Sequence, residues 1–147
     1  MSKTRILIHL VFVTRNRYQT IPLLKRERVY SYITSIIKNN GCNPLAINGM
    51  SDHVHILINL NPNIALATLV QNIKGSSSKW MKGEEDFIKF DGWGKGYFAA
   101  SVSPTVFDSC KNYIQNQEIH HGGKALLEEL KYLLEKSELK WYDDDWE

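Results

Sequence analysis

The sequence predicts an α+β domain of the ferredoxin-like, or split βαβ, class, in which an antiparallel sheet has helices on one face and is followed by C-terminal helices. Two observations predict this class. Short β-rich and helical segments alternate in the order β-α-β-β-α-β. The 147 residues show no internal repeat or interdomain linker, and they suffice for one hydrophobic core. We therefore expect a single domain over residues 1–147, with a core at 5–121 and a C-terminal helix and acidic tail at 122–147.

The first half of the chain contains the signals for three strands and one helix. Residues 6–13 (ILIHLVFV) are apolar and β-rich, which predicts a buried strand. A helix is expected between Pro22 and the stop signal NNG at 39–41, because apolar residues recur there at helical spacing. Residues 45–49 (LAING) and 53–60 (HVHILINL) predict two strands that form a hairpin.

The second half contains the fourth strand and the remaining helices. One helix is expected to place four apolar residues on one face, namely Leu66, Leu69, Val70 and Ile73. Residues 83–96 predict a loop, and 97–102 (YFAASV) predict the fourth strand. Ser103 suits an N-cap and Pro104 the first helical position, so a third helix is expected to run to about His121. A last amphipathic helix and the tail WYDDDW follow, and the tail could pack on the domain, cover the site or contact a partner.

Composition limits the classes of function and the compartment. A net charge of +2 excludes a strongly basic protein, so any nucleic-acid binding must come from a local patch. Cys42 and Cys110 lack metal-ligand spacing and fit reduced thiols. The first apolar run contains His9 and is followed by no secretory cleavage signal, and no segment is long enough to span a membrane. We expect a cytoplasmic protein.

The segment HVHILINL places two histidines on one side of a strand. Because side chains alternate along a strand, His53 and His55 lie side by side with α-carbons roughly 6.5–7 Å apart. Both imidazoles could reach one cation and leave coordination positions open for a third ligand, water and substrate. The spacing alone leaves open two half-exposed histidines without a ligand. Histidine-triad nucleotide hydrolases are disfavoured, because Leu57 stands where they have a third alternating histidine.

The third helix brings a tyrosine and a glutamine onto one face. Tyr113 and Gln117 are four residues apart and flank an apolar stripe. A glutamine beside the core needs either a structural hydrogen bond or a metal bound by its carbonyl oxygen. Taken alone, the pattern favours an ordinary boundary tyrosine and a backbone-bonded glutamine. His120 and His121 fit residues that interact with the helix dipole better than ligands.

Basic residues occur beside aromatic residues after the first strand and along the second helix. Cations interleaved with aromatic rings suit single-stranded nucleic acid, whose phosphates need charge and whose bases can stack. The alternative is a solvated helix face with tryptophans partly in the core. The candidate DNA-binding residues are Arg15, Arg17, Lys74, Lys79, Lys82 and Trp93.

Five segments together resemble a known family: FVTRNRY, MSDHVHILINL, IKGSSSKW, WGKGYFAASVS and NYIQNQEIHH. They resemble the HUH-type single-tyrosine transposases of the insertion-sequence 200/605 group, including the REP-associated branch. The likeness extends from His9 to about Leu134. The most specific part is the pair His-x-His followed by Tyr-x-x-x-Gln on a downstream helix.

The resemblance implies both a reaction and the residues for it. It implies that His53, His55 and Gln117 hold a divalent metal, Mg or Mn, and that Tyr113 is the nucleophile. The reaction would cleave and rejoin single-stranded, hairpin-forming DNA through a 5′-phosphotyrosine, without a small-molecule cofactor. Members of the family act as homodimers, in which the tyrosine helix of one subunit can serve the metal site of the other.

Two other functions stay open at the level of sequence. One is a non-catalytic module that binds structured DNA or RNA and derives from such an enzyme. The other is a metal-dependent phosphohydrolase that uses water as its nucleophile on small substrates.

Overall fold

The chain folds around one four-stranded antiparallel sheet. The computed structural model describes residues 2–117 and 126–147. Within them the sheet has the order β2-β3-β1-β4, with strands β1 (Leu7–Val13), β2 (Asn43–Met50), β3 (His53–Asn59) and β4 (Phe98–Ser101). Each neighbouring pair is antiparallel, so β1 and β2 run parallel on either side of β3. This arrangement is the split βαβ topology that the sequence predicts.

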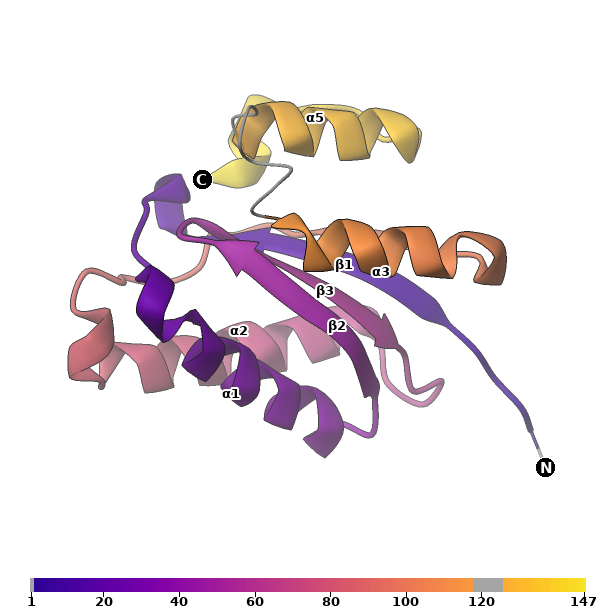
Figure 1. The fold of residues 1–147 in the computed structure, drawn as a ribbon, viewed down its shortest axis with the longest axis horizontal. Helices are drawn as coiled ribbons and strands as arrows, with labels where there is room; N and C mark the ends of the chain where they lie inside the picture. The colour runs from indigo at the N-terminus through magenta and orange to yellow at the C-terminus, as the bar shows by residue number, and fades with distance from the viewer. Residues whose placement is uncertain (1, 118–125) are drawn as a thin grey trace.

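Helices cover both faces of the sheet (Figure 1). The helices are α1 (Arg26–Asn39), α2 (Leu66–Lys82), α3 (Phe107–Gln115) and α5 (Leu126–Lys136). The pair α1 and α2 packs on one face, against residues such as Phe12 and Ile56. The pair α3 and α5 lies over the other face, where Val11, Phe98 and Leu130 share a second apolar cluster. The C-terminal helices therefore close the face that contains His53 and His55.

The helix expected from Ser103 to about His121 is divided in the structure. Residues Pro104–Val106 form a 3-10 turn, and α3 begins at Phe107. The Ser103 hydroxyl bonds the hydroxyl of Thr105 at 2.8 Å and does not cap a backbone N–H. At the other end, Asn116 leaves helical geometry, with φ −105° and ψ 29°, so α3 ends at Gln115. The rest of the expected helix, 118–121, lies outside the described residues.

The acidic tail packs on the domain. The Trp146 side chain is buried among the apolar residues under α5, and its carbonyl accepts a hydrogen bond from Arg17 Nη1 at 3.0 Å. The backbone of Glu147 also bonds Lys95 N at 3.1 Å. A Cβ at Gly94 would lie 2.8 Å from the Glu147 oxygen, so this close approach requires glycine. None of the described helices is both long enough and apolar enough to cross a membrane.

Candidate active site

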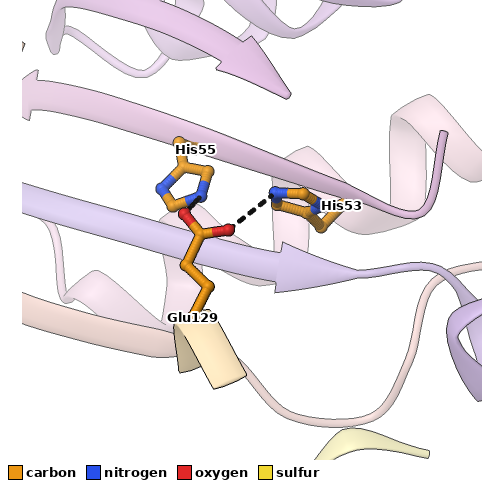
Figure 2. A group of neighbouring side chains, drawn as sticks. All are labelled: His53, His55 and Glu129. Carbon is orange, nitrogen blue, oxygen red and sulfur yellow. Dashed lines mark ion pairs between the residues drawn. The ribbon is translucent and has the colours of Figure 1, made fainter. Parts of the chain in front are cut away.

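The two histidines of β3 are fully buried. They point toward α3 and α5, and Figure 2 shows both imidazoles facing a carboxylate from α5. His53 and His55 each have 0% exposed surface, which excludes the half-exposed arrangement that the sequence left open. The ligand-type nitrogen Nε2 of His53 lies 3.2 Å from Oε1 of Gln117. The alternation of β3 thus brings both imidazoles to one buried point.

Each histidine is held at its other ring nitrogen. Nδ1 of His53 lies 2.7 Å from Oδ1 of Asp52. Nδ1 of His55 lies 2.9 Å from Nε2 of His9, whose ring stacks on that of His55. Burial, reinforced by the neighbouring His55, lowers the pKa of His9 to about 3, so His9 is neutral at neutral pH. Such contacts fix the tautomer and orientation of ligand histidines, and here they direct Nε2 of both rings into the site.

Gln117 is buried and its amide is oriented. Its Nε2 donates to the backbone oxygen of Tyr113 at 3.4 Å. Its carbonyl oxygen therefore faces His53. Although α3 ends at Gln115 and Asn116 leaves helical geometry, Gln117 still contacts His53.

Tyr113 lies beside the histidine pair in the same chain. Its ring centroid is 5.8 Å from that of His55 and 6.3 Å from that of His9. Its hydroxyl donates a hydrogen bond to Oε1 of Glu129. Burial, followed by the hydrogen bond and negative charge of Glu129, raises the pKa of Tyr113 above its usual range. Tyr113 is therefore a protonated phenol in this state.

Glu129 is the site residue that sequence reasoning missed. It comes from α5 and is 3% exposed. Its Oε1 lies 3.0 Å from Nε2 of His55, and its Oε2 lies 3.7 Å from Nε2 of His53. One signal was available in the sequence: Glu129 occupies the leucine stripe of an amphipathic helix, where an acidic residue is rarely buried without a partner.

This set of donors fits a divalent metal ion. Ligand atoms of His53, His55 and Glu129 all lie within 4.8 Å of one another. Imidazole nitrogens with carboxylate and amide oxygens are a usual ligand set for first-row divalent ions. The oxygens of Gln117 and Glu129 also suit harder ions such as Mg²⁺.

The predicted DNA-binding residues divide into two groups. Arg15, Lys79 and Lys82 line a shallow depression of about 490 Å³ at the end of α2. Lys79 and Lys82 are exposed there. This depression is a local basic patch. Because the net charge of the chain is only +2, any nucleic-acid binding must come from such a patch.

The other candidates already have structural contacts. Arg17 bonds Trp146, and Lys74 Nζ donates to the carbonyls of Gly94 and Gly96. Burial lowers the pKa of Lys74. The two hydrogen bonds from its Nζ hold the loop in place at Gly94 and Gly96. Lys74 and Trp93 also line the depression. Trp93 is 7% exposed, contacts Phe12 and Phe90, and donates to Ser77 Oγ at 2.9 Å, so most of its ring belongs to the core. This burial follows because the loop folds back onto α2.

Comparisons with known proteins identify the class as transposases. The chain belongs to the IS200-like transposase family, whose model matches residues 2–117. The matched span contains His53, His55, Tyr113 and Gln117 and ends before Glu129.

Two curated relatives have similar sequences. The ISDra2 transposase TnpA of Deinococcus radiodurans is 25% identical over 114 residues, which cover 74% of this chain and 81% of that protein. The transposase for insertion sequence element IS200 of Salmonella typhimurium is also 25% identical over 114 residues, covering 74% of each chain.

Two solved structures share the fold. A protein of Deinococcus radiodurans R1 described as a transposase matches with a TM-score of 0.64 and 24% identity, covering 79% of this chain and 93% of that one. The REP-associated tyrosine transposase bound to a REP hairpin matches with a TM-score of 0.63 and 14% identity, covering 100% of this chain and 92% of that one. At these identities the likeness concerns the fold alone.

Proposed function

We propose that this transposase cleaves and rejoins single-stranded DNA through a 5′-phosphotyrosine on Tyr113, with a divalent metal held by His53, His55 and Gln117. One observation carries the proposal. The hydroxyl of Tyr113 and Nε2 of His55 contact the same carboxylate oxygen, so the nucleophile and the candidate ligands converge at one buried point. Membership of the IS200-like transposase family supports DNA as the substrate.

The metal would bind Nε2 of His53, Nε2 of His55 and Oε1 of Gln117. When bound, it polarises a phosphoryl oxygen and offsets negative charge in the transition state. Mg²⁺ and Mn²⁺ are the expected ions. The two imidazole donors favour the softer Mn²⁺ in affinity, because Mg²⁺ prefers oxygen ligands.

Tyr113 would act as the nucleophile. Its oxygen forms a bond to phosphorus while the bond from phosphorus to the 3′-oxygen breaks. The phenolic proton leaves along the hydrogen bond that the hydroxyl donates to Glu129. The departing 3′-oxygen takes up a proton and becomes a hydroxyl. Because the phosphodiester is exchanged for a phosphotyrosine, another 3′-hydroxyl can reverse the step and rejoin strands.

Two surfaces support binding of a hairpin-bearing single strand. A cavity of about 650 Å³ between α3, β4 and α5 is lined by Tyr113 and His9 and also by Lys136. It gives a path to the nucleophile with a cation for a phosphate. The basic depression formed by Arg15 and neighbouring lysines would bind the backbone of the adjoining DNA.

One chain contains the complete set of candidate residues, which supports cleavage in cis. The family resemblance predicts a homodimer, and a dimer is compatible with either arrangement. Mixing Tyr113→Phe chains with His55→Ala chains distinguishes them. Cleavage in cis predicts no adduct in the mixture beyond that of either variant, whereas restored adduct formation would require a tyrosine acting in trans.

The test of the proposed function is a covalent adduct. The protein is incubated with hairpin-bearing single-stranded DNA and Mn²⁺, and the adduct is resolved on a denaturing gel. We expect an adduct that EDTA abolishes, that Tyr113→Phe lacks, and that the control Tyr18→Phe retains, because Tyr18 is exposed on the surface. Salt-dependent binding without any adduct would favour the non-catalytic module. Metal-dependent hydrolysis that survives Tyr113→Phe would favour a phosphohydrolase.

A further inference from the structure

Two side-chain oxygens lie close to the inward-facing nitrogen of His53. Nδ1 of His53 lies 2.7 Å from the Asp52 carboxylate, and in the tautomer that donates this hydrogen bond Nε2 presents a lone pair. Around this Nε2 lie Oε1 of Gln117 at 3.2 Å and Oε2 of Glu129 at 3.7 Å. In that tautomer all three atoms are acceptors, and a cation among them would offset their mutual repulsion.

His55 extends the same arrangement. When its Nδ1 donates to the neutral His9, its Nε2 presents a lone pair to Oε1 of Glu129 at 3.0 Å. The ligand atoms of the two histidines and Glu129 lie within 4.8 Å of one another, which matches the span around a single divalent ion. The carboxylate adds the only formal negative charge among these inward-facing groups.

Packing of α5 fixes the position of Glu129. The leucines of this helix share an apolar cluster with Val11, Val13 and Phe98 on the sheet. Glu129 lies in the same stripe and points to the histidines (Figure 2). An ionised carboxylate is costly to bury unless it is paired or binds a metal. The geometry therefore indicates a role for this carboxylate at the site.

We infer that Glu129 is a fourth protein ligand of the metal centre and that its Oε1 also holds the hydroxyl of Tyr113. This inference rests on the proposed function and adds a residue to it. The match to the family model ends at residue 117, so Glu129 lies outside the matched span. Four protein ligands would leave room on a six-coordinate ion for a phosphoryl oxygen and water. The carboxylate links the nucleophile to the metal centre.

The test is the affinity of the full chain for Mn²⁺ without DNA, measured from the electron paramagnetic resonance signal of free Mn²⁺. Glu129→Gln keeps the shape of the side chain and removes its charge. We expect affinity to fall by about tenfold or more, because ligand charge sets the affinity of such sites. Glu128→Gln is the matched control, since Glu128 is the exposed neighbour on α5, and it should bind Mn²⁺ like the unmodified chain. Unchanged affinity in Glu129→Gln overturns the inference.

A second variant keeps the test decisive if Glu129→Gln does not fold, as judged by circular dichroism. Glu129→Asp retains the charge but withdraws the oxygens by one methylene, and it should bind Mn²⁺ more weakly than the unmodified chain. Equal affinity would overturn the inference. The DNA adduct assay is independent. If Glu129→Gln loses Mn²⁺ affinity while the unmodified chain forms no adduct, the ligand assignment stands and the proposed function fails.

Discussion

Strand β3 contributes side chains to both faces of the sheet, but the two faces are filled by different kinds of side chain. On the face covered by α1 and α2, β3 presents Val54 and Ile56 to a predominantly apolar core. On the face covered by α3 and α5, the same strand presents His53 and His55 to a buried polar cluster centred on Glu129. All four strand residues are 0% exposed.

The two faces therefore have different roles: the first stabilises the fold, and the second contains the candidate active site. Apolar packing needs only volume and water exclusion, so the first face holds the fold together. Buried polar groups need partners in specific positions, so the second face has strict requirements on orientation. The comparison predicts that substitutions on the first face change stability and that those on the second face change metal and DNA chemistry.

The largest expected effect is on the apolar face. Ile56→Ala removes a fully buried side chain and should lower the free energy of unfolding by about 2–5 kcal/mol, because it leaves a cavity. Urea denaturation measures this change. Ile88→Ala is the control, since Ile88 is 88% exposed and its loss should change little. A small effect of Ile56→Ala would contradict the assignment of this face as the stabilising core.

Substitution of Asp52 tests whether its carboxylate orients the ring of His53. Asp52→Asn weakens the charged contact with Nδ1 of His53 and should lower Mn²⁺ affinity about 10–100-fold, as loss of such supporting contacts does. Calorimetric titration measures the affinity. Asp108→Asn, on the exposed first turn of α3, should leave it unchanged. Equal affinities in the two variants would show that Asp52 does not orient the ring.

The pH dependence of stability tests the burial of His9. Its folded pKa of about 3 lies below the ordinary value of 6.5, so the unfolded chain binds this proton first as pH falls. The contribution of His9 should therefore be retained above pH 6.5 and be lost between 6.5 and about 3, at up to about 1.4 kcal/mol per pH unit. The carboxylate of Glu129, the imidazole of His55 and the ammonium group of Lys136 act on the same group. Chemical denaturation at several pH values should show a shallower loss in His9→Gln than in the unmodified chain, and parallel curves would contradict this.

The smallest expected effect is on the basic depression. Lys79→Gln should weaken single-stranded DNA binding a few-fold and reduce the slope of log affinity against log salt by about 1, because one phosphate contact is lost. Fluorescence anisotropy over a salt series measures both. Lys38→Gln, at the exposed end of α1, should leave the slope unchanged. An unchanged slope in Lys79→Gln would remove this surface from the DNA path.

The fold could be predicted from the sequence because its signals are local. The period of two in HVHILINL places His53 and His55 on one face, and the turn before them predicts the hairpin that the structure contains. The spacing of four between Tyr113 and Gln117 likewise predicts neighbours on a helix, and both residues do lie beside the histidines.

The rest depends on long-range packing that no local pattern encodes. Periodicity shows that Glu129 faces a core, but it does not show which face of the sheet α5 covers. Trp93 belongs to the segment 83–96, which the sequence predicts to be a loop. Its side chain is nevertheless buried against Phe12, because the loop folds back. The sequence predicts a helix that continues to about His121, whereas α3 ends at Gln115. The contact between Gln117 and His53 is long-range, so no local pattern indicates it.

The proposed reaction joins Tyr113 covalently to DNA at the polar face. The most direct measurement is mass spectrometry of the protease-digested adduct formed with hairpin-bearing single-stranded DNA and Mn²⁺. We expect a single modified peptide that contains Tyr113, with the phenolic oxygen bonded to a 5′-phosphate, and a free 3′-hydroxyl on the released strand. Linkage to another residue, linkage through a 3′-phosphate, or cleavage without any linked peptide would contradict it.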